Sequence, residues 1–152
     1  MEQRDLKYEF YIGAAPETVW NALVSPEGTR QTFFGSVIHS TFEAGAPYEY
    51  IGPGAEGPDV VHVYGTILAY EPNKLLSMTE HPGATYAADH ETRTSRITYT
   101  LETMGGCTKL TLVNDQWSPD NASYENAEKH WWMILSNIKT LCETGKTLDF
   151  GW

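Results

Sequence analysis

The chain has 152 residues, of which 41% are apolar and 20% are charged, a composition that suits one globular domain with a sizeable core. Its formal net charge of −10 argues against nucleic acid and anionic membranes as partners, because phosphate binding needs a surplus of lysine and arginine. No apolar run is long enough to span a membrane and the N-terminus lacks the apolar core of a signal peptide, so we expect a cytoplasmic protein.

The first part of the sequence predicts one strand followed by two short helices. Residues 6–12 alternate between apolar and polar side chains, which is typical of a half-buried strand. Pro16 fits the first turn of a helix, where its missing N–H is not needed, and Trp20 lies on the apolar face of that helix. A second short helix is expected from Thr29 to Phe34.

The middle of the sequence predicts a succession of strands separated by turns. The expected strands cover residues 37–42, 48–51, 60–70, 74–80, 93–102 and 108–116. Stretches rich in glycine and proline, such as residues 52–58 and Gly105-Gly106, are typical of the turns between them. Short connections between consecutive strands indicate an antiparallel meander.

The longest periodic segment runs from Asn121 to Gly145. Apolar residues recur there at steps of three and four, which predicts a long helix with one continuous apolar face. Asn121 or Ser123 can cap its start, and Gly145 can take the left-handed conformation that ends a helix. Strands followed by one long helix indicate an α+β fold, in which a sheet covers the apolar face of this helix.

Four segments of the chain carry recognisable patterns in a fixed order. Tyr11 to Leu23 contains Ala-Ala-Pro-Glu-Thr-Val-Trp-Asn-Ala-Leu, and Tyr64 to Leu75 places a glycine, a proline and a leucine at the spacing of a hairpin. Lys109 to Leu112 matches a penultimate strand, and Trp131 to Gly145 matches a terminal helix. From about residue 8 to 148, this order resembles the START-like (SRPBCC) superfamily, and within it the branch homologous to the activator of heat-shock protein 90 ATPase.

The resemblance implies a helix-grip fold. In that fold a curved antiparallel sheet of about six strands wraps around a long C-terminal helix, with two short helices after the first strand. The match begins at the first strand, so the resemblance implies a single START-like domain over residues 1–152, of the single-domain bacterial type. The usual functional space of this fold lies between the concave face of the sheet and the terminal helix, where a gap can hold a small apolar molecule.

Residues that face this space are expected on the apolar face of each strand and of the terminal helix. The predicted ligand-binding residues are Tyr48, Tyr50, Met78, Tyr99, Asn114, Trp117, Trp131 and Leu135. Tyrosine and tryptophan suit planar or amphipathic ligands, because their rings stack and their O–H and N–H groups orient a partner; the alternative is an aromatic-rich core. Asn114 continues the apolar alternation of its strand, so its amide needs either a ligand or a backbone partner.

The sequence contains no recognisable catalytic or metal-binding motif. Its five histidines lack the spacing of metal ligands, and its two cysteines do not form a Cys-x-x-Cys pair. We therefore expect no metal, no cofactor and no catalytic residue, and we favour non-catalytic binding of a small hydrophobic or aromatic molecule by a monomer or homodimer.

Two alternative functions follow from the resemblance. One is an enzyme of the cyclase, dehydratase or hydrolase type acting on aromatic or polyketide-like substrates. It requires a titratable pair in the pocket, for instance a histidine or glutamate facing Tyr99 or Trp131. The other is a module that binds a chaperone, as an activator of heat-shock protein 90 ATPase does.

Overall fold

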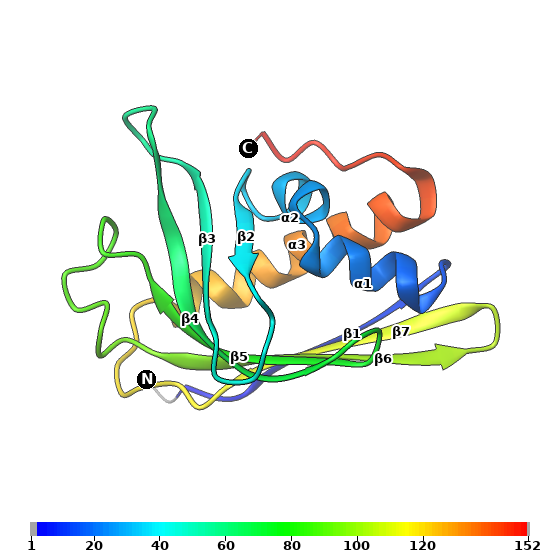
Figure 1. Ribbon diagram of the computed structural model, residues 1–152, viewed down its shortest axis with the longest axis horizontal. Coiled ribbons are helices and arrows are strands. Elements are labelled where there is room, and N and C mark those ends of the chain that lie inside the picture. Colours follow the sequence, from blue (N-terminus) through cyan, green and yellow to red (C-terminus); the bar gives the residue numbers. More distant parts are fainter. Residues whose placement is uncertain (1–2, 152) are drawn as a thin grey trace.

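The computed structural model describes residues 3–151, so residues 1–2 and 152 of the predicted domain lie outside the described part (Figure 1). The strands are β1 (Leu6–Ile12), β2 (Val37–Ser40), β3 (Pro47–Pro53), β4 (Asp59–Glu71), β5 (Leu75–Pro82), β6 (Ser95–Met104) and β7 (Cys107–Asp115), and the helices are α1 (Pro16–Val24), α2 (Pro26–Thr32) and α3 (Tyr124–Thr144). The predicted α+β helix-grip fold is confirmed, with seven strands in this part of the chain where about six were expected. None of the helices within residues 3–151 has the length and hydropathy needed to cross a membrane.

The sheet is an antiparallel meander to which the first strand is added at one edge. Its strand order is β1-β7-β6-β5-β4-β3-β2. β1 pairs with β7, so that Leu6 lies opposite Asn114 and Ile12 lies opposite Thr108. The first and last strands of the chain therefore lie side by side, and the sheet leads directly into α3.

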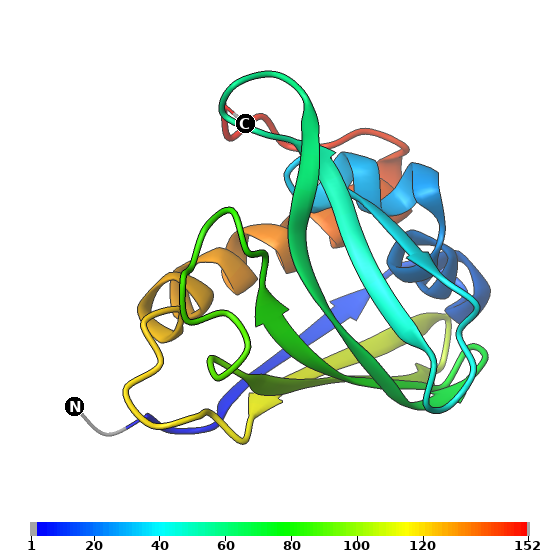
Figure 2. The ribbon, with the colours of Figure 1, turned by 60° about the vertical axis from the view of Figure 1, so that its left-hand side comes forward.

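A sharp bend in β4 makes the sheet concave. The register shifts between Tyr50 and Ile51 where β3 meets β4, and again between Ile67 and Ala69 where β4 meets β5. Such irregularities bend a strand and increase its twist. As a result, β3 and β4 rise beside α3, whereas β6 and β7 run beneath it (Figures 1 and 2).

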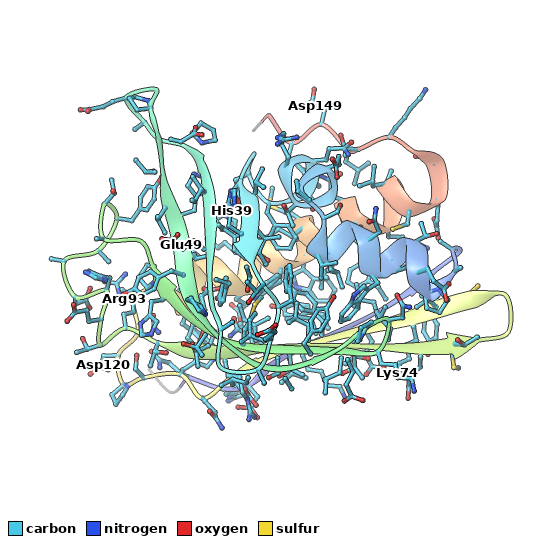
Figure 3. All side chains as sticks on the ribbon, in the orientation of Figure 1. His39, Glu49, Lys74, Arg93, Asp120 and Asp149 are labelled. Carbon is cyan, nitrogen blue, oxygen red and sulfur yellow. The ribbon has the colours of Figure 1, made fainter. Side chains whose placement is uncertain are left out.

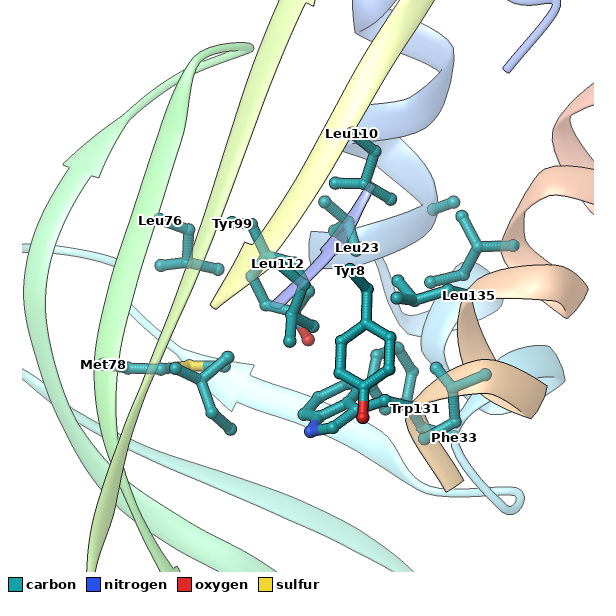
Figure 4. Packing of buried hydrophobic residues seen from close by; sticks show 14 of the residues in the cluster. Tyr8, Leu23, Phe33, Leu76, Met78, Tyr99, Leu110, Leu112, Trp131 and Leu135 are labelled. Atoms are coloured by element: carbon teal, nitrogen blue, oxygen red, sulfur yellow. The ribbon is translucent and has the colours of Figure 1, made fainter. Parts of the chain in front are cut away.

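The core lies between the concave face of the sheet and the helices (Figures 3 and 4). The most deeply buried aliphatic side chains, with at most 1% of their surface exposed, are Ile12, Val19, Leu23, Ile67, Leu76, Ile97, Leu110, Leu112, Leu135 and Ile138. Charged residues such as Lys74, Asp120 and Asp149 lie on the outside (Figure 3). The apolar face predicted for the terminal helix is therefore the face that the sheet covers.

The start of α2 differs from the predicted one, whereas α3 begins directly after one of its two predicted caps. The second helix was expected from Thr29, but α2 begins at Pro26, because Pro26 fits the first turn and the Ser25 hydroxyl accepts a hydrogen bond from the Gly28 N–H. Ser123 occupies the N-cap position of α3 without a side-chain capping hydrogen bond, while the Asn121 side chain accepts a hydrogen bond from the Ser123 N–H at 2.8 Å. Its predicted end is confirmed, since Gly145 has a left-handed φ of 79°.

Candidate functional site

A cavity of about 220 Å³ lies between the sheet and the N-terminal half of α3. Its walls come from the segment after α2, from β3 to β6, and from α3. Most of the lining is apolar and comprises Phe33, Phe34, Val63, Met78, Pro82, Ile97, Ala127, Trp131 and Ile134. The α3 side of this cavity is an aromatic wall.

Glu80 is the acidic group in this apolar lining. It follows Leu76 and Met78 at two-residue steps along β5, so its side chain points to the inner face of the sheet. Thr79 points outward, where its hydroxyl accepts a hydrogen bond from the Thr66 N–H at 2.9 Å. Burial raises the pKa of Glu80 from 4.5 to about 7, and within residues 3–151 no hydrogen bond or neighbouring cation offsets this effect.

Tyr99 brings a hydroxyl without a protein partner to the cavity. Its side chain is 1% exposed, and within residues 3–151 the hydroxyl forms no hydrogen bond. Burial, and then Tyr50 and Glu80, raise the pKa of Tyr99, and the Tyr50 hydroxyl lies nearby without meeting hydrogen-bond geometry. Leaving a buried hydroxyl unpaired costs about 1 to 3 kcal/mol. By contrast, the Tyr48 hydroxyl donates to the Thr79 carbonyl at 2.6 Å.

Two histidines also line the cavity. The His62 ring makes a 2.9 Å hydrogen bond with the Pro53 carbonyl, which holds that ring in place. The pKa of His130 is lowered by burial and by Lys129, so this ring is neutral at pH values around neutrality. Across the described stretch there is no cluster of three or more His, Cys, Asp or Glu side chains that could hold a metal ion.

The structure brings half of the predicted ligand-binding residues to the cavity. Tyr50, Met78, Tyr99 and Trp131 line it. Tyr48, Asn114, Trp117 and Leu135 are not part of the lining, although Tyr48, Asn114 and Leu135 are almost completely buried. Alternation along a strand correctly selects the inner face, but the cavity occupies only one end of that face, and Leu135 lies in the packed core beyond it.

Asn114 has a structural role that explains why it is polar. Its side-chain oxygen accepts a hydrogen bond from the Trp131 indole N–H at 3.0 Å, and its amide N–H₂ donates to the Ser95 hydroxyl and to the Arg96 carbonyl. The Trp117 indole N–H donates to the Asn114 carbonyl at 3.0 Å. Asn114 therefore fixes the orientation of Trp131, which in turn forms part of the cavity wall.

Several lining residues escaped the sequence analysis, although a signal for them exists. Glu80 continues the alternation of Leu76 and Met78 along β5, but a charged residue was not among those expected on the apolar face. Ala127 and Ile134 are one helical turn away from Trp131 on each side, on the same apolar face. Phe33 gave no such signal, because only the packing of α2 against α3 brings it to the cavity.

Residues 13–143 match the family model described as activator of Hsp90 ATPase homolog 1-like protein. The chain belongs to this family. The resemblance inferred from the four sequence segments is thereby confirmed over most of the chain. No match was found among curated protein sequences.

Solved structures similar to this chain show the same fold. Protein MLL2253 from Mesorhizobium loti has a TM-score of 0.71 at 24% identity, over 91% of this chain and 96% of that one. The Aha1 dimer from Colwellia psychrerythraea has a TM-score of 0.70 at 17% identity, over 94% of this chain and 98% of that one. DynU16, a putative protein of the dynemicin biosynthetic locus, has a TM-score of 0.71 at 16% identity, over 97% of this chain and 49% of DynU16.

Proposed function

We propose that this protein binds a small hydrophobic or aromatic molecule, without converting it, in the cavity between the sheet and α3. The observation that carries the proposal is the buried Tyr99 hydroxyl, which forms no hydrogen bond with the described residues and belongs to the lining of a mostly apolar cavity. Ligand sites typically combine an apolar wall with a few polar groups that fix orientation. The family fold is compatible with this role.

The volume of the cavity limits the size of the ligand. An apolar cavity of about 150 Å³ holds benzene, whereas sites for drug-sized molecules measure roughly 300 to 1,000 Å³. The present cavity of about 220 Å³ lies between these values. It therefore suits a molecule of one or two rings, in contact with Trp131 on one side and Met78 on the other.

Titration with naphthalene, followed by NMR on isotope-labelled protein, tests the proposal. We expect the Trp131 indole signal and the backbone signals of β5 to shift. Ala127→Phe fills the cavity from α3 and is expected to weaken binding at least about tenfold. Ala55→Phe, in the exposed loop before β4, is the matched control and should bind normally. Absence of binding, or equal binding by both variants, would contradict the proposal.

Proton transfer is a second candidate function, which Glu80 specifically favours. A general acid–base group works best with a pKa near the operating pH, and burial raises the pKa of Glu80 to about 7. In a ketone substrate, the carboxylate would take a proton from the carbon beside the carbonyl. Tyr99 would donate a hydrogen bond to the resulting enolate oxygen, and Glu80 would return the proton to carbon.

Deuterium exchange into β-tetralone, a ketone with exchangeable protons beside its carbonyl, tests this second function. The protein should accelerate exchange in heavy water, and Glu80→Gln should return the rate to that of the buffer. An equal rate for the parent protein and the variant would leave ligand binding as the better proposal. Binding to a heat-shock-90-class chaperone stays a prediction from family membership, which a pull-down with the purified chaperone would decide.

A further inference from the structure

The polar groups of the cavity restrict the chemistry of its ligand, given the proposed binding function. Tyr99 on β6 and Glu80 on β5 both contribute to the lining, and they interact electrostatically. The Tyr99 hydroxyl can donate one hydrogen bond and needs an acceptor, whereas an ionised Glu80 carboxylate can only accept. A complementary ligand therefore offers an acceptor to Tyr99 and a donor to Glu80.

Several other polar groups at or near the cavity already have protein partners, among them Ser36, whose hydroxyl donates to the Phe33 carbonyl at 2.6 Å. Tyr48 is committed to the Thr79 carbonyl, and His62 is committed to the Pro53 carbonyl. His130 is held neutral by burial and by the nearby Lys129, so it brings no positive charge to the lining. No lysine or arginine of the described residues lines the cavity. An anionic ligand would thus meet the Glu80 carboxylate without a compensating cation.

We infer that the ligand is an uncharged aromatic molecule of one or two rings that carries a hydroxyl group. A hydroxyl both donates and accepts hydrogen bonds and has no charge. A hydrocarbon offers neither, a ketone offers only an acceptor, an ammonium group offers only donors, and a carboxylate is repelled. The ring system fits the wall formed by Trp131, Met78 and Ile97, and Figure 4 shows Tyr99 reaching from β6 into the region between Met78 and Trp131.

A matched series of naphthalene derivatives tests this selectivity. The affinities of naphthalene, β-naphthol, β-naphthoate and naphthalene-2-methylamine are measured by titration calorimetry at about pH 8, where the phenol stays neutral and Glu80 is mostly ionised. We expect β-naphthol to bind about tenfold more tightly than naphthalene, and both charged derivatives to bind more weakly than β-naphthol.

Two variants identify the groups responsible. Tyr99→Phe and Glu80→Gln should each reduce the ratio of naphthol to naphthalene affinity about three- to tenfold, while the affinity for naphthalene itself shows that the variant is folded. The two compounds differ in solubility, but this difference is the same for the parent protein and for each variant. It therefore does not affect the change in the affinity ratio between them.

The possible outcomes separate the two proposals. If naphthalene binds but β-naphthol has no advantage, or if neither variant changes the ratio, the inferred hydroxyl selectivity is wrong and the binding function stands. Strongest binding of the amine or of the carboxylate would equally overturn the selectivity. If none of the four compounds binds, or if Ala127→Phe leaves naphthalene binding unchanged, both proposals fall.

Discussion

Glu80 combines a strand position that requires an inward side chain with an environment that penalises its charge. Burial raises its pKa from 4.5 to about 7. Between these two pH values the folded protein binds more protons at Glu80 than the unfolded chain does. The contribution of this residue to stability is therefore most favourable below about pH 4.5 and is lost as the pH rises through about 7.

The variant Glu80→Gln is expected to remove this pH dependence. At about pH 8 the variant should be more stable than the parent protein by no more than about 3 kcal/mol. This upper limit follows because one pKa unit corresponds to about 1.36 kcal/mol and because the partial exposure of Glu80 reduces the effect. At about pH 4 the two proteins should be nearly equal. Urea unfolding of both proteins at a series of pH values measures the difference between their free energies of unfolding. The exposed carboxylates are the same in both proteins, so their contributions cancel in this difference. A difference that does not vary with pH would show that Glu80 is not desolvated.

At the scale of elements, the bend in β4 places Glu80 beside the cavity. Gly65 lies at this bend, and a Cβ atom there would be only 2.1 Å from the Thr79 carbonyl oxygen. The same oxygen accepts the hydrogen bond of the Tyr48 hydroxyl. The close approach of β4 and β5 at this point therefore depends on a residue without a side chain.

Gly65→Ala is expected to destabilise the protein by about 1 to 3 kcal/mol, because the added methyl group forces the two strands apart. Gly106→Ala, in the hairpin between β6 and β7, is the control: no atom lies within 4 Å of the added Cβ, so the change should stay within about 0.5 kcal/mol. The midpoints of urea unfolding compare the two. Equal midpoints would mean that β4 accommodates a side chain at residue 65.

At the scale of the whole molecule, one buried amide joins α2, α3 and the segment after α3. Asn137 is 2% exposed, and its oxygen accepts a hydrogen bond from the Leu148 N–H at 2.7 Å. Its N–H₂ group donates to the Gln31 carbonyl at 3.3 Å. The C-terminal segment thereby runs back over the two short helices (Figure 1).

Asn137→Ala is expected to cost about 1 to 3 kcal/mol, because it removes the two hydrogen bonds that this buried amide makes with the Gln31 carbonyl and the Leu148 N–H. It should also raise the hydrogen-exchange rate of the Leu148 amide. Ser136→Ala is the neighbouring control, since its side chain is only partly buried and makes no hydrogen bond of its own in the described structure. Unchanged exchange at Leu148 in Asn137→Ala would show that the segment is held by other contacts.

The local sequence pattern was sufficient for the order and type of the elements. The strand from Leu6 to Ile12 and the helix end at Gly145 were predicted at the residues where they occur, because alternation and left-handed glycine are properties of the chain itself. Family membership followed from the order of four such segments, which the match over residues 13–143 confirms.

Only the tertiary structure decided which residues surround the cavity. The alternation pattern identifies the inner face of each strand, yet it does not say where along that face the sheet and α3 separate. The register shifts in β3 and β4, together with the packing of α2 against α3, place Phe33 and Glu80 at the cavity and leave Leu135 in the solid core. Asn114 was recognised as a buried polar group in need of a partner, but its partner, Trp131, comes from a helix that only long-range packing brings within 3.0 Å.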